Sequence, residues 1–227
     1  MSLAERYGAA KAKIASAALA AGRRADEVTL IVVTKNHPAQ LALDLLDLGA
    51  RDFGENRDQE AGPKSTEVRS LSPVEHRWHF IGQLQSNKVK SVLSYAASIH
   101  SLDRLSLLDA LGKATVERPN PVDVFIQLNL TDDQGRGGIQ PSGLVEFAES
   151  VLTKPGLNLV GVMGVAALDH QLERDFGAIR SASELLQTIA PQAKAISAGM
   201  SEDFETAIAF GATHVRIGSA ITGNRRY

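Results

Sequence analysis

The sequence of 227 residues contains no cysteine, so it can form neither a disulfide nor a thiolate metal site. It also has no apolar run of the about 18 residues that a membrane-spanning helix requires. Residues 1–24 mix charged side chains with alanines, whereas a secretory signal contains a continuous apolar stretch. The net charge of −2 gives no electrostatic footprint for nucleic acid or for an anionic membrane. We therefore expect a cytoplasmic protein that binds neither nucleic acid nor membranes.

What the sequence does have is a regular alternation of short β-rich runs with helical patterns, which is typical of parallel βαβ units. Eight such units close into a (β/α)₈ TIM barrel, whereas a doubly wound sheet would more often contain about five or six. We predict a single α/β barrel domain over residues 1–227. The predicted strands are residues 29–35, 51–56, 78–82, 98–102, 122–129, 159–165, 194–199 and 213–221.

Helices are predicted from apolar spacing and from residues that begin or end a helix. Residues 38–48, for example, begin with Pro38 and stop at Gly49. Because little chain follows the eighth strand, the alanine-rich residues 3–21 are predicted to complete the outer ring of helices. The polar residues 132–138, with three glycines, indicate an exposed, flexible loop. The remaining predicted helices are residues 102–117, 141–152, 173–189 and 201–210.

Lys35 follows the apolar run TLIVVT at the end of the first predicted strand. Burial disfavours the charged form of an amine, so a lysine there could become a neutral nucleophile able to form a Schiff base. The alternative is a lysine whose ammonium simply extends into solvent at a strand end. The residues around Lys35 leave both interpretations open.

The ends of the seventh and eighth predicted strands are rich in glycine and serine. In a (β/α)₈ barrel the loops after these two strands often form a phosphate site. Ser201 is a candidate cap for the helix that follows, and the free N–H groups of such a helix attract anions. Gly218 permits close approach of a ligand to the backbone, and Ser219 adds a hydroxyl. A capped turn without a ligand remains the alternative.

Three further polar residues lie in or beside predicted strands. Arg216 stands between apolar neighbours and must be paired with a carboxylate or with a ligand, because it cannot lose its charge. Asn56 follows the second strand and either contacts a ligand or caps the next helix. His79 is more typical of a hydrogen-bonded core or rim histidine than of a catalyst, and with His76 it forms only a weak metal signal, so we predict no metal site.

Taken together, the strand ends resemble the pyridoxal phosphate homeostasis protein family. The resemblance runs from Val33 to Arg225 in the same order, and its longest motif, WHFIGQLQSNK, is highly specific. Departures from the family pattern are Asn36-His37 in place of a frequent Thr-Lys pair, Gln83 in place of Pro and Ala198 in place of Met. The motifs are VTK at 33–35, FGEN at 53–56, WHFIGQLQSNK at 78–88, SAGMS at 197–201 and VRIGSAI at 215–221.

The resemblance implies a single (β/α)₈ barrel like the N-terminal domain of alanine racemase, binding pyridoxal 5′-phosphate (PLP) through a Schiff base. It implies that Lys35 carries the cofactor and that Arg216 faces the pyridine nitrogen. By the same resemblance, the phosphate is held by Ser201, Gly218 and Ser219, and the ring is lined by Asn56 and Ser197.

An arginine at the pyridine nitrogen disfavours the protonated ring and so makes PLP a poor electron sink. Alanine racemase also takes a second acid/base from a further domain, for which this chain has no length. We therefore expect a monomeric, non-catalytic protein that stores, buffers or delivers PLP, with PLP and PLP-dependent apo-enzymes as partners. The alternatives are a PLP-dependent amino-acid racemase or lyase and, less favoured, an aldolase-like barrel that uses Lys35 without a cofactor.

Overall fold

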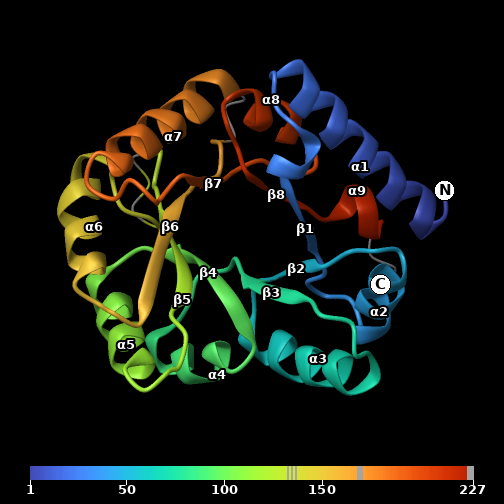
Figure 1. Ribbon diagram of the computed structural model, residues 1–227, viewed down its shortest axis with the longest axis horizontal. Helices are drawn as coiled ribbons and strands as arrows, with labels where there is room; N and C mark the ends of the chain where they lie inside the picture. Colours follow the sequence, from blue (N-terminus) through green and yellow to red (C-terminus); the bar gives the residue numbers. More distant parts are fainter. Residues whose placement is uncertain (132, 134, 136, 168–170, 224–227) are drawn as a thin grey trace.

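The computed structural model describes residues 1–131, 133, 135, 137–167 and 171–223. Its centre is a closed barrel of parallel strands in sequence order, in which β8 pairs with β1 and aligns Arg216 with Ile31. Helices surround the barrel on the outside (Figure 1). The predicted (β/α)₈ fold is confirmed. The strands are β1 Thr29–Val33, β2 Asp52–Glu55, β3 Arg77–Phe80, β4 Ala96–Leu102, β5 Val122–Gln127, β6 Leu157–Met163, β7 Ala195–Ser197 and β8 His214–Ile217.

The helices between the strands cover the outer face of the barrel. None of those in the described part of the chain is long and apolar enough to cross a membrane. The α-helices are α1 Leu3–Ala20, α2 Ala39–Asp47, α3 Asp58–Leu71, α4 Val89–Leu93, α5 Leu105–Thr115, α6 Leu144–Leu152, α7 Leu172–Gln187, α8 Phe204–Ala209 and α9 Ser219–Thr222. The short 3₁₀ turns are η1 Ala25–Glu27, η2 Ser86–Lys88 and η3 Pro141–Gly143.

The N-terminal helix α1 completes the ring, as predicted for residues 3–21. A capping box begins it: the Ser2 hydroxyl accepts from the Glu5 N–H, and the Glu5 carboxylate accepts from the Ser2 N–H. Its buried face, which includes Tyr7 and Ile14, packs beside α8 and α9 (Figure 1). The two ends of the described chain therefore meet on one side of the barrel.

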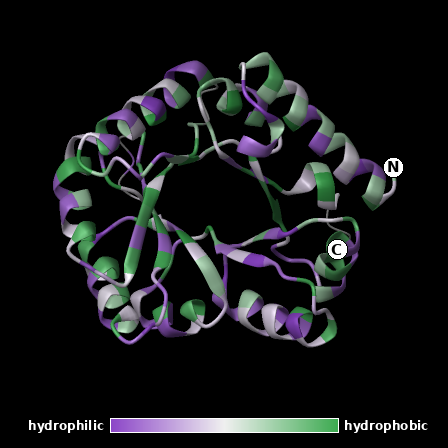
Figure 2. Cartoon of the chain, in the orientation of Figure 1, coloured by the Kyte–Doolittle hydropathy of each residue, from purple (hydrophilic) through white to green (hydrophobic). Residues whose placement is uncertain are grey.

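The strands are buried on both faces, as parallel strands under helices must be. Figure 2 shows β5 and β6 as mostly hydrophobic, whereas β3 carries hydrophilic residues. The polar side chains of β3 include His79, which is 5% exposed. A buried polar side chain needs hydrogen-bond partners, so the barrel interior is not purely apolar.

Two predicted boundaries near the end of the chain are wrong: the end of the eighth strand and the start of the helix after the seventh strand. The strand predicted to end at residue 221 stops at Ile217, because Gly218 leaves the extended conformation (φ −110°, ψ −94°) and α9 begins at Ser219. The helix predicted from residue 201 begins at Phe204, so Ser201 is not its N-cap. Asp203 occupies the N-cap position, and its carboxylate accepts from the Met200 N–H at 2.5 Å.

No bounds were predicted for helix α3, which was expected only as the helix after Asn56, or for helix α4. Gly62 and Pro63 interrupt the helical pattern of α3, and its buried face includes Lys64 and Ser65 instead of a row of aliphatic residues. Helix α4 is too short for a helical period to be visible.

The predicted flexible loop 132–138 lies partly outside the described residues. Its described end returns to β5, where the Gln127 amide donates to the Gly137 carbonyl at 3.1 Å and Leu128 forms a β-bridge with Ile139.

Candidate functional site

The residues predicted to form the site all lie at the carboxyl-terminal mouth of the barrel. Because the strands are parallel, the ends of β1, β2, β7 and β8 open on the same side. These elements place Lys35 and Asn56 after β1 and β2, Ser197 and Ser201 at and after β7, and Arg216, Gly218 and Ser219 along and after β8.

The backbone on each side of Lys35 is fixed by side chains of β2 and α3. Before it, the Thr34 hydroxyl donates to Glu55 Oε1 at 2.7 Å, and Lys64 Nζ donates to the Thr34 carbonyl at 2.8 Å. After it, Asn36 adopts a left-handed conformation (φ 62°), and its N–H donates to Glu60 Oε2 at 2.9 Å. Lys35 therefore has a defined position at the mouth.

The structure distinguishes the two interpretations of Lys35. Its side chain is exposed, as the second interpretation expects, so the apolar strand before it does not bury the amine. The neighbouring Glu55 is directed toward other side chains: its Oε1 accepts hydrogen bonds from Thr34 and, at 2.6 Å, from Lys64, and all three side chains are buried.

The loops after β7 and β8 converge on two hydroxyl groups. Ser201 Oγ and Ser219 Oγ are 3.5 Å apart, and the Ala220 N–H points to Ser201 Oγ at the same distance. Gly218, the turn between β8 and α9, lies beside Val33 of β1. Hydroxyl and N–H donors close together suit a phosphate group, which accepts hydrogen bonds from both.

Arg216 extends inside the barrel and is 5% exposed. Its NH1 donates to Ser197 Oγ at 2.6 Å and its NH2 to the Gly164 carbonyl at 3.0 Å. It makes no ion pair with any carboxylate in the described part of the chain, so the expected alternative of a structural ion pair is wrong. Burial lowers the pKa of Arg216 to about 10, and the negative charge of Asp203 opposes that shift.

Asn56 is not a helix cap, since α3 has Arg57 at its N-cap position. Its Oδ1 is buried and has no hydrogen-bond partner among the described residues, so this acceptor is available to a ligand that can donate. The backbone of Asn56 is held closely by Gly82, where an added Cβ would lie 2.2 Å from the Asn56 carbonyl oxygen.

His79 lies deeper in the barrel and is hydrogen-bonded on both ring nitrogens, to His100 and to Asp52. The prediction of a satisfied core histidine is confirmed. Two supporting residues were not predicted: His100, which contacts Ser197 from inside the barrel, and Lys64 of α3, which contacts the Thr34 carbonyl. No local pattern indicated either residue, because His100 is an ordinary position in a strand and the inner face of α3 is not a row of aliphatic residues.

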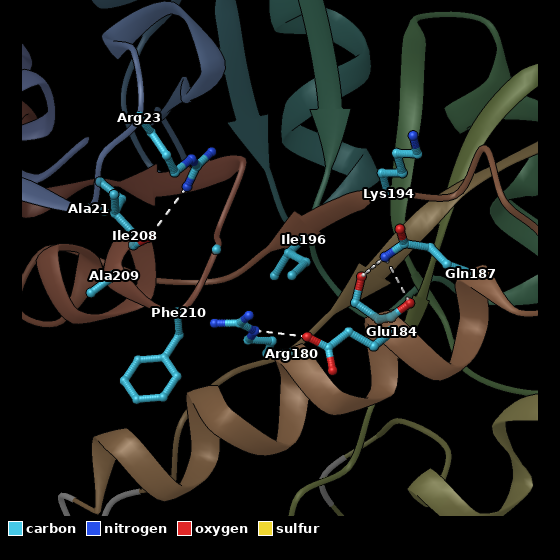
Figure 3. Close-up of a pocket in the computed structure, with 12 residues that line it drawn as sticks. Ala21, Arg23, Arg180, Glu184, Gln187, Lys194, Ile196, Ile208, Ala209 and Phe210 are labelled. Carbon is cyan, nitrogen blue, oxygen red and sulfur yellow. Dashed lines mark hydrogen bonds and ion pairs between the residues drawn. The ribbon is translucent and has the colours of Figure 1, made fainter. Parts of the chain in front are cut away.

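Another crevice lies away from this mouth, between α7 and α8 (Figure 3). It has a volume of about 340 Å³ and includes Arg23, Arg180 and Lys194. Arg180 is paired with Glu184 at 2.9 Å, and Arg23 donates to the Ile208 carbonyl. None of the predicted site residues lines this crevice.

Comparisons with known proteins agree with this geometry. Residues 9–226 match the family described as alanine racemase, N-terminal domain. The pyridoxal phosphate homeostasis protein of Escherichia coli K12 is 39% identical over 218 residues, which are 95% of this chain and 93% of that protein. The protein of the same name from Mycobacterium tuberculosis H37Rv is 35% identical over 240 residues, covering 99% of this chain and 93% of its own length.

Solved structures also match this chain in fold. The structure of PipY from Synechococcus elongatus PCC7942 with PLP bound is 31% identical and has a TM-score of 0.85, covering 98% of this chain and 100% of that one. Alanine racemase from Corynebacterium glutamicum shares the fold, with a TM-score of 0.67 at 16% identity over 95% of this chain and 62% of that chain.

Proposed function

This chain belongs to the pyridoxal phosphate homeostasis protein family, and from that premise we propose that it binds PLP covalently through Lys35 and stores or delivers it without turnover. The relative PipY is described with PLP bound. The residues at the mouth fit the cofactor: an exposed amine for its aldehyde, two hydroxyls 3.5 Å apart for its phosphate and a buried guanidinium for its ring.

The observation that carries the proposal is Arg216, buried at the mouth with no carboxylate paired to it in the described residues. When bound, PLP supplies an aldehyde that forms a covalent bond with an amine and a ring that can withdraw electrons from a bound amino acid if its nitrogen is protonated. Arg216 remains protonated and can only donate a hydrogen bond. It would therefore keep the ring nitrogen an acceptor, which favours holding the cofactor over catalysis.

The other residues would bind and orient the cofactor. Ser201, Ser219 and the backbone at Gly218 would hold the phosphate, because they present hydroxyl and N–H donors together. Asn56 and Ser197 would line the ring, Asn56 through its unpartnered Oδ1. The hydrogen bonds around Thr34 and Asn36 would keep Lys35 in place during attachment.

The attachment point is tested by borohydride reduction of the PLP-loaded protein followed by peptide mass mapping. We expect one labelled lysine, Lys35, and no label in Lys35→Ala. Lys194→Ala is the matched control, since Lys194 is exposed in the separate crevice of Figure 3. A label retained in Lys35→Ala at the wild-type level would overturn the assignment.

The absence of turnover is tested by incubating the loaded protein with each amino acid in deuterated water. We expect no exchange of the α-hydrogen above the level given by free PLP. Exchange at enzymatic rates that is lost in Lys35→Ala would favour a racemase or lyase instead.

We further propose that the protein acts as a monomer and gives PLP to apo-enzymes that need it, since Lys35 is exposed at the mouth. Sedimentation of the loaded protein tests the first point. Activation of a PLP-dependent apo-enzyme by the loaded protein, in the presence of an agent that traps free PLP, tests direct delivery.

A further inference from the structure

A line of hydrogen-bonded side chains crosses the barrel interior from the carboxyl-terminal mouth to the opposite one. Arg216 NH1 lies 2.6 Å from Ser197 Oγ, and Ser197 Oγ lies 2.8 Å from His100 Nδ1. His100 Nε2 then lies 3.0 Å from His79 Nδ1, and His79 Nε2 lies 2.8 Å from Asp52 Oδ1. We call these five residues the interior relay.

The interior relay is shielded from water along most of its length. Ser197 and His100 are fully buried, and His79 and Arg216 are each 5% exposed. Hydrogen bonds in such surroundings are strong, and an unpartnered group there is costly. Removing the hydrogen-bonding group of one residue is therefore expected to disturb the hydrogen bonds of its neighbour in the interior relay.

The lower end of the interior relay reaches the amino-terminal mouth. Asp52 forms two hydrogen bonds with Arg77, at 2.8 and 3.1 Å. Arg77 and His79 line a cavity of about 270 Å³ together with residues from the starts of other strands, among them Asp123 and His214. The relay therefore joins the predicted cofactor mouth to the other end of the barrel.

The two ends of the interior relay determine which nitrogen of each histidine carries hydrogen. Arg216 can only donate, so Ser197 Oγ accepts from it and its own hydrogen is free for His100 Nδ1. His100 then carries its hydrogen on Nε2 and donates to His79 Nδ1. His79 in turn donates from Nε2 to the carboxylate of Asp52, which can only accept.

This assignment requires both histidines to be neutral. Burial keeps the pKa of His100 well below its usual value of 6.5. Hydrogen bonds from His79 and Arg77 outweigh burial and lower the pKa of Asp52, so its carboxylate stays ionised. The directions of the pKa shifts of His100 and Asp52 thus agree with the hydrogen-bond geometry.

We propose that His100 and His79, anchored on Asp52, are positioning residues that fix Ser197 as an acceptor and so hold the Arg216 guanidinium in a single orientation as the donor to the ring nitrogen of PLP. This inference rests on the proposed function. With His100 in place, the Ser197 hydroxyl hydrogen is directed away from Arg216, so Ser197 Oγ is a fixed acceptor. Without His100, the Ser197 hydroxyl loses the acceptor for its hydrogen and can rotate. The contact between Arg216 NH1 and Ser197 Oγ is then no longer fixed.

The first test uses the protein without PLP, so it does not depend on cofactor binding. Nitrogen-15 NMR of the histidine side chains reports which ring nitrogen carries hydrogen. We expect hydrogen on Nε2 of both His100 and His79 at neutral pH. Hydrogen on Nδ1 of His100, or a charged His100, would overturn the relay whether or not PLP attaches to Lys35.

The second test compares His100 variants for PLP affinity and for the pH profile of the visible band of bound cofactor. His100→Phe keeps the ring shape, which stacks on Phe125 at 4.2 Å, but removes both hydrogen bonds. We expect this variant to weaken PLP binding about fivefold, which corresponds to the loss of the one hydrogen bond that fixes Ser197. We also expect the pH profile of the visible band to shift. His100→Asn retains an acceptor near the Nδ1 position and should restore affinity to within about twofold.

His214→Asn is the control, because His214 bonds to Thr213 and is not a member of the interior relay. If His100→Phe does not fold, His79→Gln interrupts the relay one residue lower and should give a smaller shift in the same direction. Wild-type affinity and an unchanged pH profile in the folded His100→Phe or His79→Gln variant would overturn the proposal. A wild-type protein that does not attach PLP to Lys35 would instead contradict the proposed function.

Discussion

Lys64 Nζ lies 2.6 Å from Glu55 Oε1, and this ion pair is buried, with the Lys64 side chain 6% and the Glu55 side chain 0% exposed. The same Nζ donates to the carbonyl of Thr34, the residue before Lys35. Burial raises the pKa of Glu55, and the hydrogen bond and charge of Lys64 oppose that rise. The buried Lys64–Glu55 ion pair thus fixes the Thr34 backbone, and through it the position of Lys35.

Replacing Lys64 with Met should destabilise the protein by about 3–5 kcal/mol, because it leaves the Glu55 carboxylate buried without a countercharge. Urea unfolding measures this change. The double variant Lys64→Met/Glu55→Gln removes both charges and should recover part of the loss. A single variant as stable as the wild type would show that the ion pair is dispensable.

The hydroxyls of Ser201 and Ser219 should matter for PLP but not for pyridoxal, which lacks the phosphate. Hydrogen bonds to a charged group are worth about 1.5–3 kcal/mol, so Ser201→Ala/Ser219→Ala should weaken PLP binding at least tenfold. Equilibrium titration with both compounds checks this, with the exposed Ser70→Ala as control. An equal loss of affinity for PLP and for pyridoxal would show that these two hydroxyls do not bind the phosphate.

Acid should destabilise the fold between pH 6.5 and about pH 4. Burial lowers the pKa of His214 to about 4, with the charge of His79 as a smaller cause. In this range the unfolded chain binds a proton that the folded protein does not, so stability is full above pH 6.5 and falls as the pH drops. The expected slope is about 1.4 kcal/mol per pH unit for each proton.

His100, whose pKa is lowered in the same direction, should add to this slope. Urea midpoints measured from pH 7 to pH 4 test the prediction, and His214→Asn should reduce the slope. Stability that is constant over this range would contradict the buried, neutral state of both histidines.

Adding one methyl group at Gly82 should disturb the site. A Cβ there would lie 2.2 Å from the Asn56 carbonyl oxygen, so Gly82→Ala should cost about 1–3 kcal/mol and reduce PLP affinity by moving Asn56. Gly8→Ala is the matched control: nothing lies within 4 Å of its Cβ, and alanine in helix α1 should stabilise by about 0.5–1 kcal/mol. Thermal unfolding and PLP titration of both variants measure the difference.

Much of the barrel could be predicted because its signals are local. Several strands, such as β1, are short apolar runs, and several helices have visible starts or stops, such as Gly49 and Gly211. Local signals failed where polar residues are buried. Helix α3 turns Lys64 inward toward Glu55, so its inner face does not look like the inner face of a helix.

The sequence by itself determined the alternation of strands and helices, the residues at each strand end and the family to which the chain belongs. These are properties of neighbouring residues or of motifs in a fixed order. Only the tertiary structure decided which side chains meet. His100 and Ser197 are 97 positions apart in sequence, and Lys64 and Thr34 are 30 apart. Their contacts exist because barrel closure brings distant strands together, and no periodicity along the chain encodes that distance.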